Sequence, residues 1–295
     1  MTSPLVSFVI VTHDRAKWVT KAIRSIQQQT IDCGEIVVVV NGRDEETETA
    51  LRTIGQDVRT TFLDANYGVG TGRNAGIQLA RGEVLFFLDD DAELYQADAA
   101  ARALNHFRRD SDLAVVGFLV LDTTDTVERR SIPFRDKRVP RSIAPACYFV
   151  GTACAIHRRA LDRVGFFDGS LFYGGEELDL SYRLLDAGFQ IVFDPSVVVV
   201  HHRTGGPTRS LTPYYDARNR PLVALRHLPL LYCATHIFAW WARSLAKGLY
   251  GGQMLTACRG IYDCVTRMPA VWRKRRTISR RTHRLLADNG GRLWY

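Results

Sequence analysis

The sequence lacks the features of three common classes of protein. Its six cysteines are scattered and include no CxxC pair, which excludes a disulfide framework or a zinc ribbon and favours free thiols in a reducing cytosol. No basic segment with an apolar core precedes the strand-like run at Leu5, so no secretory signal peptide is expected. The apolar stretch 228–242 contains His236 and is followed by Arg243, which makes it too short and too interrupted for a membrane span. The cysteines are Cys33, Cys147, Cys154, Cys233, Cys258 and Cys264.

Acidic residues are also few near the C-terminus. Residues 216–295 contain 15 Lys or Arg and three Asp, which gives a formal charge of +12, whereas residues 1–215 carry −4 of the total of +8. A basic segment on an acidic body predicts contact with something anionic, either phospholipid or nucleic acid. Hydrophobic residues make up 46% of the chain and charged residues 24%, as in globular proteins with a sizeable core.

Short apolar, β-branched runs alternate with helical spacing over the first 90 residues. Strands are expected at 5–11, 35–40, 58–63 and 83–88, and helices near 18–26, 44–54 and 72–80. This order predicts an α/β fold with a doubly wound, mostly parallel sheet. Ligands bind such sheets at the carboxyl ends of the strands, and those ends carry Asp14, Asn41, Asn66 and the triplet at 89–91.

The rest of the chain divides into two parts. Residues 120–145 are irregular, charged and rich in proline, and we expect a long loop beside the site. Beyond Pro213 the pattern becomes helical and basic. We therefore expect an α/β domain over residues 1–215 and a basic, aromatic helical extension over residues 216–295.

Three consecutive aspartates, Asp89, Asp90 and Asp91, follow directly after an apolar strand. Neighbouring carboxylates repel one another unless a cation or a set of donors neutralises them. Oxygen ligands of this kind suit Mg²⁺ or Mn²⁺, which also bridge the oxygens of a diphosphate. A solvated acidic turn is the alternative, although the position at a strand end favours a metal site.

A glycine-rich loop spans residues 66–76, with the sequence NYGVGTGRNAG, and opens a helix. Glycines let the backbone approach a ligand closely, a helix N-terminus favours anions, and Arg73 can pair with phosphate. The loop is not a dinucleotide-binding fingerprint, because Arg73 stands where the third glycine belongs. A flexible turn without a ligand is an equal alternative.

Two further motifs carry candidate groups. Residues 174–183, with the sequence GGEELDLSYR, place carboxylates beside two glycines at a helix start, where acids also serve as simple caps. His201 follows the apolar run 197–200, and a histidine there is either structural or a ligand.

Taken in order, these motifs resemble the family 2 inverting glycosyltransferases of the GT-A fold, and within them the rhamnosyl- and galactofuranosyltransferase-like group. The resemblance covers roughly residues 5–220. It runs through the opening strand VSFVIVT, the loop at 66–76, the aspartate triplet, Gly151-Thr152-Ala153, Gly165-Phe166-Phe167-Asp168, Glu176-Glu177-x-Asp179-Leu180, Ala187-Gly188-Phe189 and His201.

The resemblance implies roles for individual residues. Asp89 and Asp91 match the DxD motif and would hold Mn²⁺ or Mg²⁺ together with His201, while Asp89 or Asp90 would meet the ribose. Glu177 stands where the family has its catalytic base, usually Asp, and Glu176 and Asp179 are the other candidates for the catalytic role. The remaining residues expected to bind the nucleotide-sugar are Thr12, Asp14, Asn41, Asn66, Gly70, Arg73 and Asn74.

One departure concerns the nucleotide base. Family members commonly end the second strand with Val-Asp-Asn, whose Asp bonds the pyrimidine ring, whereas this chain has Val40 before Asn41. Valine accepts no hydrogen bond, so base recognition must involve Asn41, Asp14 or backbone groups. A UDP- or dTDP-sugar is implied by the resemblance alone.

The reaction implied is a single displacement with inversion, in which a hexosyl or deoxyhexosyl group passes to a hydroxyl of a glycan or lipid-linked acceptor. Glu177 would deprotonate that hydroxyl, and a divalent ion would stabilise the charge on the leaving diphosphate. Cell-wall or polysaccharide biosynthesis is the implied process. The alternatives are a nucleotidyltransferase, disfavoured because the turn at 12–17 has no glycine, and a non-catalytic nucleotide-sugar-binding protein.

The C-terminal extension suggests a membrane surface as a partner. Trp240, Trp241, Leu245 and Leu249 recur at helical spacing, and six cations follow at 273–276 and 280–281. We expect a cytoplasmic enzyme held peripherally on the inner face of the cytoplasmic membrane. Nucleic acid is not expected, because the extension lacks the interleaved aromatics of a single-strand platform. Packing on the catalytic domain or on a second subunit, as in a homo-oligomer, is the alternative for the aromatic face.

Overall fold

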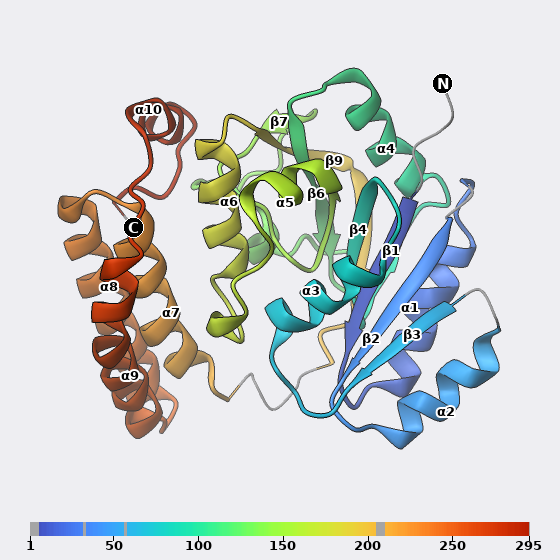
Figure 1. Cartoon of the computed structure of the whole chain (residues 1–295), viewed down its shortest axis with the longest axis horizontal. Coiled ribbons are helices and arrows are strands. Elements are labelled where there is room, and N and C mark those ends of the chain that lie inside the picture. Colours follow the sequence, from blue (N-terminus) through green and yellow to red (C-terminus); the bar gives the residue numbers. More distant parts are fainter. Residues whose placement is uncertain (1–5, 32–33, 56–57, 205–209, 295) are drawn as a thin grey trace.

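The computed structural model describes residues 6–31, 34–55, 58–204 and 210–294. One mixed sheet, built from strands between Val6 and His201, has the order β3-β2-β1-β4-β8-β6-β9-β5, with β7 paired to β9 (Figure 1). Its strands are β1 (Val6–Thr12), β2 (Glu35–Asn41), β3 (Val58–Leu63), β4 (Val84–Asp89), β5 (Ala92–Leu94), β6 (Leu113–Leu121), β7 (Ala144–Pro145), β8 (Ala153–His157) and β9 (Gln190–His201).

The first four strands pair in parallel, as the sequence predicts. Ile10 of β1 lies opposite Val38 of β2 on one side and Leu88 of β4 on the other. Runs of valine and isoleucine favour such strands because both faces of the sheet are covered. The other half is mixed, since β8 is antiparallel to β4 and β6, β5 is antiparallel to β9, and β6 and β9 are parallel.

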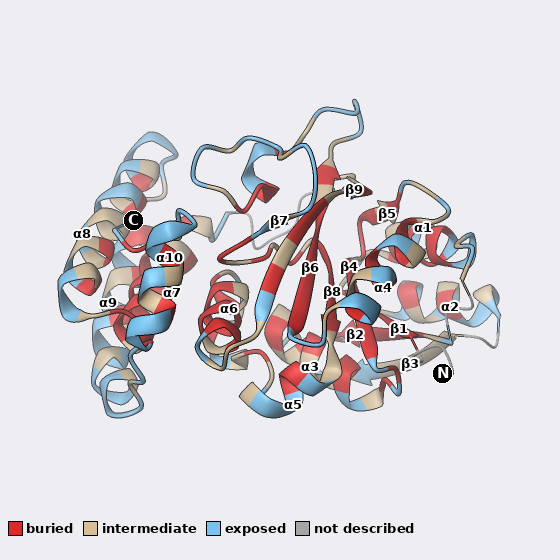
Figure 2. Ribbon diagram, turned by 90° about the horizontal axis from the view of Figure 1, so that it is seen from above, coloured by how far each residue is buried: buried red, intermediate tan, exposed pale blue. Residues whose placement is uncertain are grey.

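Helices cover both faces of the sheet. Alternate residues of β1 point to opposite sides: Phe8 joins a core with α1 (Ala16–Gln27) and α4 (Ala99–Arg109), and Val9 joins a core with α3 (Val69–Leu79), α5 (Arg158–Val164) and α6 (Glu176–Asp186). Figure 2 shows these buried faces in red around the central strands. The predicted α/β fold is confirmed.

The helix predicted at 72–80 begins earlier, at Val69, because Gly68 with a φ of 85° ends the loop and caps it. The helix predicted at 44–54 is α2 (Glu45–Ile54), whose cap Asp44 accepts a hydrogen bond from the backbone N–H of Thr47 at 3.0 Å. The predicted loop 120–145 holds only the end of β6, the 3-10 helix η1 (Arg129–Ser131) and β7 among its regular elements.

Four helices form the C-terminal extension, which lies beside α6 at the left of Figure 1. They are α7 (Thr212–His227), α8 (Leu230–Tyr250), α9 (Met254–Arg273) and α10 (Arg280–Asp288). The predicted domain boundary after residue 215 falls inside α7. In the part of the chain that is described, no helix is long and apolar enough to cross a bilayer.

The described cysteines are free, and Cys258 is the exposed one among them, whereas Cys33 lies outside the described residues. Burial raises the pKa of the Cys147 thiol to about 11 and that of Cys154 to about 12. These thiols are therefore protonated side chains of the core, as the scattered spacing predicts.

Candidate active site

Two aspartates and a histidine gather where β4, β5 and β9 meet. Asp89 is the last residue of β4, and His201 ends β9 opposite the first residue of β5. One ligand atom from each of Asp89, Asp91 and His201 lies within 4.8 Å of the other two. Nε2 of His201 is 3.2 Å from Oδ1 of Asp91. The residues predicted as metal ligands are thus brought together.

A second carboxylate holds the other side of the His201 ring. Oε1 of Glu128 lies 3.0 Å from Nδ1 of His201 and also accepts a hydrogen bond from Arg203. Burial lowers the pKa of His201, but its bonds with Asp91 and Glu128 outweigh this and raise the pKa to about 10. Burial raises the pKa of Glu128, yet His201 and Arg203 lower it to about 2. The ring is therefore oriented by two carboxylates.

Asp91 and Asp90 share one cation but differ in environment. Nη1 of Arg15 lies 2.8 Å from Asp90 and 3.0 Å from Asp91. Thr204 donates to Asp91 from both its backbone N–H and its hydroxyl. Burial raises the pKa of Asp91, but these donors and His201 hold it well below its usual range. Burial dominates at Asp90 and raises its pKa to about 6 despite Arg15.

Arg73 links this cluster to the start of α6. Its buried guanidinium lies 3.3 Å from Oδ1 of Asp89 and 3.6 Å from Oε1 of Glu177, and it donates to the carbonyl oxygen of Gly151 at 2.7 Å. A Cβ atom at Gly151 would lie 2.2 Å from Glu177 and 2.6 Å from Arg73. Position 151 therefore has to be glycine for these groups to meet.

The two glutamates at the start of α6 lie in different surroundings. Glu176 is buried, and its Oε2 has no hydrogen-bond partner among the described residues. Burial and the neighbouring Glu177 raise the pKa of Glu176 to about 8, so this acid is mostly protonated at neutral pH. The side chain of Glu177 is 21% exposed and can be reached by a substrate.

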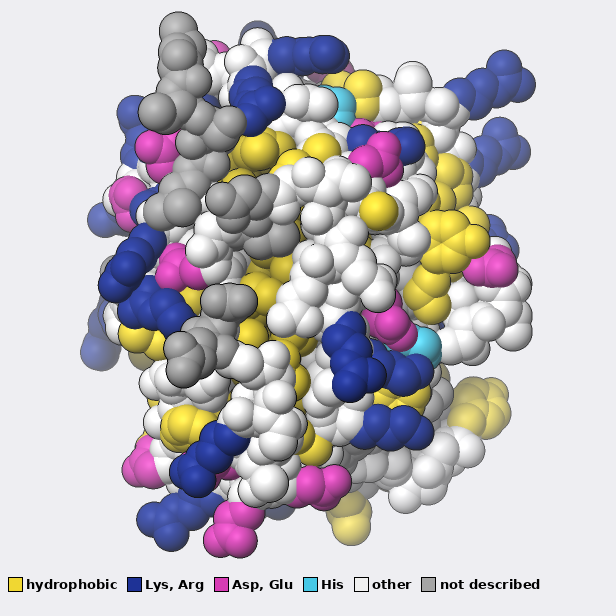
Figure 3. All heavy atoms as spheres, turned by 90° about the vertical axis from the view of Figure 1, so that its right-hand side faces the viewer, with side chains coloured by type: hydrophobic (Ala, Val, Ile, Leu, Met, Phe, Trp, Pro, Cys, Tyr) yellow, Lys and Arg dark blue, Asp and Glu magenta, His cyan; other side chains and the backbone are white. Residues whose placement is uncertain are grey.

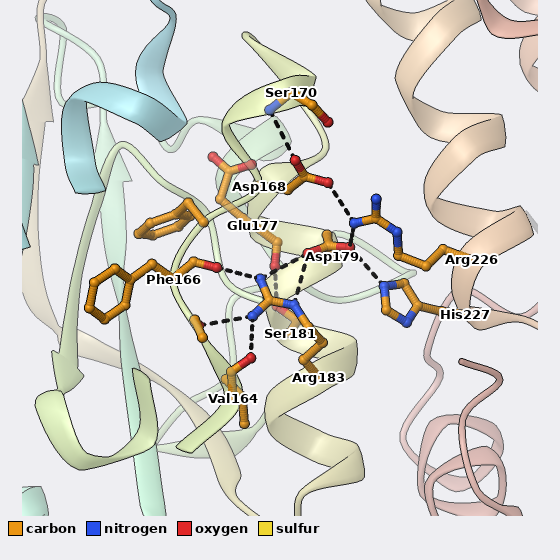
Figure 4. Close-up of polar contacts among 12 residues, drawn as sticks. Val164, Phe166, Asp168, Ser170, Glu177, Asp179, Ser181, Arg183, Arg226 and His227 are labelled. Carbon is orange, nitrogen blue, oxygen red and sulfur yellow. Dashed lines mark hydrogen bonds and ion pairs between the residues drawn. The ribbon is translucent and has the colours of Figure 1, made fainter. Parts of the chain in front are cut away.

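Asp179 is fully buried and contacts two arginines and a histidine. Arg183 lies at 2.9 Å, Arg226 of α7 at 2.9 Å and Nε2 of His227 at 2.8 Å. Arg226 also pairs with Asp168, and Figure 4 shows Glu177 pointing away from this network. Burial raises the pKa of Asp179, but these partners hold it well below its usual range. Asp179 thus fastens α6 to α7.

A buried amide of α7 orders the turn that precedes the glutamates. The amide nitrogen of Asn219 lies within hydrogen-bonding distance of three carbonyl oxygens, those of Leu171 at 2.7 Å, Tyr173 at 2.9 Å and Gly174 at 2.8 Å. Gly174 and Gly175 have φ values of 76° and 105°, which favour glycine. The extension therefore contributes directly to the shape of the site.

The asparagines predicted to bind the nucleotide-sugar hold loops in place. Asn41 donates to Asn66 and to the carbonyl oxygen of Gly68, and it accepts from the N–H of Tyr67. Asn74 exchanges two hydrogen bonds with the backbone of Phe167. Gly70 lies in the first turn of α3, where a Cβ would approach the carbonyl oxygen of Asp168 at 3.3 Å.

The end of β1 offers the most accessible polar groups. Asp14 has a φ of 54°, and its largely exposed carboxylate lies 3.4 Å from Nε2 of His13. Thr12 is buried beneath it. Val40 is buried in the sheet core, so it offers neither a donor nor an acceptor at the site.

Comparison with known proteins supplies the family. Residues 7–165 match the model of the family described as glycosyl transferase family 2. The chain belongs to glycosyl transferase family 2. The resemblance drawn from the motifs is thereby confirmed.

Curated relatives of this family-2 chain are distant. An uncharacterized glycosyltransferase of Rickettsia typhi is 27% identical over 67% of this chain and 63% of its own length. The O-antigen chain rhamnosyltransferase of Salmonella typhimurium is 23% identical over 72% of this chain and 70% of its own. The GalNAc(5)-diNAcBac-PP-undecaprenol beta-1,3-glucosyltransferase of Campylobacter jejuni is 35% identical over 31% of each chain.

Solved structures share the fold at low identity. GalNAc-T7 with UDP, GalNAc and Mn²⁺ has a TM-score of 0.62 at 17% identity, covering 91% of this chain and 58% of its own. The mannosyltransferase PcManGT from Pyrobaculum calidifontis with GDP-Man and Mn²⁺ has a TM-score of 0.59 at 18% identity. The match covers 98% of this chain and 80% of the mannosyltransferase chain. The predicted GT-A fold is confirmed.

Several residues of this family-2 site had no signal in the sequence. Glu128 lies in the irregular segment 120–145, and Asn219, Arg226 and His227 lie in a helix assigned to the extension. Arg15 lies 75 positions before Asp90 in the sequence, so its pairing with the aspartate triplet could not be predicted. Only the folded chain brings these groups to the motifs.

Proposed function

We propose that this protein is an inverting glycosyltransferase that moves a sugar from a nucleoside diphosphate to an acceptor hydroxyl. One observation carries the proposal. Arg73 pairs with Asp89, a member of the candidate metal-ligand cluster at the strand ends, and also with the accessible Glu177 at the start of α6. Single displacement needs both features, because one side of the reaction must stabilise a leaving diphosphate and the other must accept a proton.

The donor set fits a divalent metal. Asp89, Asp91 and His201 supply two carboxylates and an imidazole from positions close to one another, a combination that suits Mn²⁺ better than Mg²⁺. Glu128 supports His201 in the way that carboxylates commonly support ligating histidines. A bound ion would supply Lewis-acid stabilisation of the charge on the diphosphate.

Glu177 is the base in this proposal. Asp179 is held by two arginines and a histidine, and Glu176 is buried and mostly protonated, so neither is free to take a proton. Glu177 accepts the proton of the acceptor hydroxyl as that oxygen forms its bond to the anomeric carbon. The bond to the diphosphate oxygen breaks in the same step, which inverts the anomeric configuration.

The donor is assigned as a UDP- or dTDP-sugar. Asn41 holds the glycine-rich loop and Val40 is buried, so the exposed Asp14 is the side chain available to bond the base. The two solved neighbours bind UDP and GDP-Man, which supports a nucleoside diphosphate as the leaving group. Asp90, which pairs with Arg15, is the side chain that we propose meets the ribose.

The acceptor is assigned as a glycan or lipid-linked saccharide at the cytoplasmic membrane. The Campylobacter relative is named for an undecaprenol-linked acceptor and the Salmonella relative for O-antigen. Acceptors of this kind stay at the bilayer, so an enzyme that acts on them works at its surface. Polysaccharide biosynthesis is the corresponding process.

Release of nucleoside diphosphate tests the function. Purified protein would be incubated with UDP-, dTDP- and GDP-sugars in Mn²⁺ or in EDTA, and the freed nucleotide measured. We expect slow, Mn²⁺-dependent hydrolysis of one donor, and NMR of a glycosylated product would show the inverted anomer. Release of pyrophosphate from a nucleoside triphosphate, with no hydrolysis of any donor, would instead assign a nucleotidyltransferase.

A further inference from the structure

Large apolar side chains are exposed along one side of the helical extension. Leu231, Phe238 and Leu249 of α8 stand seven and eleven residues apart, which places them on the same side of the helix. Phe238 is 76% exposed. The surface continues at the junction with α9, where Tyr250, the last residue of α8, is 91% exposed and Leu255, in the first turn of α9, is 86% exposed. These five residues are called the outer α8 face.

The outer α8 face differs from the aromatic stripe predicted from sequence. Trp241 donates from its indole N–H to the carbonyl oxygen of Ala217 at 3.1 Å, so it packs on α7. Trp240 lies beneath the guanidinium groups of Arg220 and Arg243. Leu249 is the member of the predicted stripe that stays exposed.

Charges around the outer α8 face are cationic. Helix α8 contains no Asp or Glu, and the one acid of α9, Asp263, accepts a hydrogen bond from the hydroxyl of Tyr214 at 2.5 Å. Two exposed cations share the side of α9 that carries Leu255, because Arg259 lies one turn after it and Arg273 lies five turns after it. Arg259 and Arg273 are the cations that border the face. Arg275 is held instead by the backbone carbonyl oxygens of Leu225 and Leu228.

The opposite side of the molecule has a different character. There Lys and Arg are interspersed with Asp and Glu, as Figure 3 shows. Helix α2 on that side begins with Glu45, Glu46 and Glu48. The side that Figure 3 shows therefore mixes both signs of charge, whereas α8 and α9 together contain one acidic residue.

We propose that the outer α8 face binds the surface of an anionic phospholipid bilayer. Its apolar side chains enter the boundary between headgroups and acyl chains while the bordering cations contact lipid phosphate, the combination that peripheral membrane helices use. A second copy of this chain fits less well, because self-pairing through this face would bring together two extensions that each carry a formal charge of +12. The inference deepens the proposed function and depends on it only for the lipid-linked acceptor.

The most exposed part of this face lies at one end of the extension. The end of α8 lies beside the start of α7, since Lys247 pairs with Asp216 at 2.7 Å and Gly260 packs on Tyr214. Tyr250 and Leu255 are therefore at the end of the extension where α7 begins, and α8 lies on the far side of α7 from the sheet (Figure 1).

Sedimentation with vesicles tests this surface on the full chain. We expect binding to vesicles that contain phosphatidylglycerol, weaker binding to pure phosphatidylcholine, and a decrease at high salt because the Debye length shortens. Tyr250→Ser should lower the partition coefficient about tenfold, as when one large apolar side chain no longer leaves water. Tyr95→Ser is the matched control, since Tyr95 is 58% exposed on the catalytic part.

Three results would overturn the inference. One is full-length protein that stays in the supernatant with phosphatidylglycerol at low salt, and another is equal binding by the Tyr250 and Tyr95 variants. The third is a dimer that Tyr250→Ser dissociates, which would assign the face to a second copy. Mn²⁺-dependent nucleotide binding, measured on the same preparations, separates the two proposals. Protein that binds vesicles but no nucleotide would overturn the proposed function, and the proposed membrane surface would stand.

Discussion

Asn219 of α7 donates from its side-chain amide to the carbonyl oxygen of Gly174, two residues before Glu176, at 2.8 Å. The same nitrogen lies 2.9 Å from the carbonyl oxygen of Tyr173. A side chain of the C-terminal extension therefore sets the backbone that carries the proposed base, although it is placed to touch neither metal nor nucleotide.

Replacing this amide should lower turnover more than donor binding. We expect Asn219→Ala to reduce kcat by about 10²-fold, the order of loss that a small misplacement of reacting groups causes, with the donor KM changed less than about threefold. Buried carbonyl oxygens left without a donor should lower the free energy of unfolding by about 1–3 kcal/mol. Asn105→Ala on the exposed surface of α4 is the control. Equal losses in kcat and donor affinity would contradict a positioning role.

Asp91→Ala should abolish Mn²⁺-dependent nucleotide binding and nearly all transfer. The reason is that Asp91 combines with Asp89 and His201 as a candidate ligand. Calorimetric titration of nucleoside diphosphate with and without Mn²⁺ measures the effect, and circular dichroism checks the fold. Asp112→Ala, an exposed carboxylate before β6, should behave as wild type. Near-normal turnover of the Asp91 variant in Mn²⁺ would disprove the metal assignment.

Glu177→Gln and Glu176→Gln should differ strongly in turnover. The Glu177 amide cannot accept a proton, so we expect a loss of about 10²-fold or more with donor binding unchanged. The Glu176 amide is nearly isosteric with the buried, mostly protonated acid, so we expect little change near pH 7. Steady-state kinetics on both variants decides between them, and the reverse pattern would transfer the role to Glu176.

Glu128→Gln should weaken Mn²⁺ binding by about 10–100-fold, the usual effect of removing the partner of a ligating histidine. Glu93→Gln is a matched control, because Glu93 bonds the neighbouring His202, which is outside the proposed ligand set. Electron paramagnetic resonance of free Mn²⁺ in the presence of nucleotide gives the affinity directly. Unchanged affinity in the Glu128 variant would show that His201 needs no such support.

Asp179 should make stability depend on pH in the acid range. Its pKa is lowered in the folded state, so its contribution is fully present above the ordinary Asp pKa of about 3.9 and is lost as pH falls toward the folded pKa. We expect Asp179→Asn to cost about 3–5 kcal/mol at pH 7.

The difference in unfolding free energy between wild type and Asp179→Asn should stay constant from pH 7 to 5 and shrink below about pH 4. Urea denaturation across this range measures it, and Asp162→Asn on the exposed side of α5 serves as a control. A difference that is independent of pH would mean that Asp179 is not held ionised by its partners.

The sequence was sufficient where local pattern decides structure. The strand at 58–63 was predicted with its observed bounds, and the triplet at 89–91 was placed at a strand end because apolar runs stop abruptly there. The candidate ligands Asp89, Asp91 and His201 came from motif order, which reflects the family rather than any local rule.

The remaining site residues depend on contacts between distant segments. Glu128 meets His201 across 73 positions and Asn219 meets Gly174 across 45, so no periodicity or spacing could connect them. Trp240 and Trp241 were predicted to share one apolar face, with membrane contact and packing on protein both left open, and the structure packs the Trp241 indole against Ala217. Helical spacing shows which residues share a side but not what that side contacts.

The fastening of α6 to α7 has a consequence for how the enzyme is made on the ribosome. Synthesis as far as residue 201 supplies all the candidate ligands and Glu177. The turn before Glu176, however, is held by a hydrogen bond from Asn219, and Asp179 is held by Arg226 and His227, all of which are synthesised later. Residues 292 and 293 join this assembly, since His236 of α8 bonds the carbonyl oxygen of Leu293 and Tyr182 of α6 donates to that of Arg292. A nascent chain would therefore carry the proposed catalytic carboxylates unordered, and so inactive, until at least residue 227 has left the ribosome.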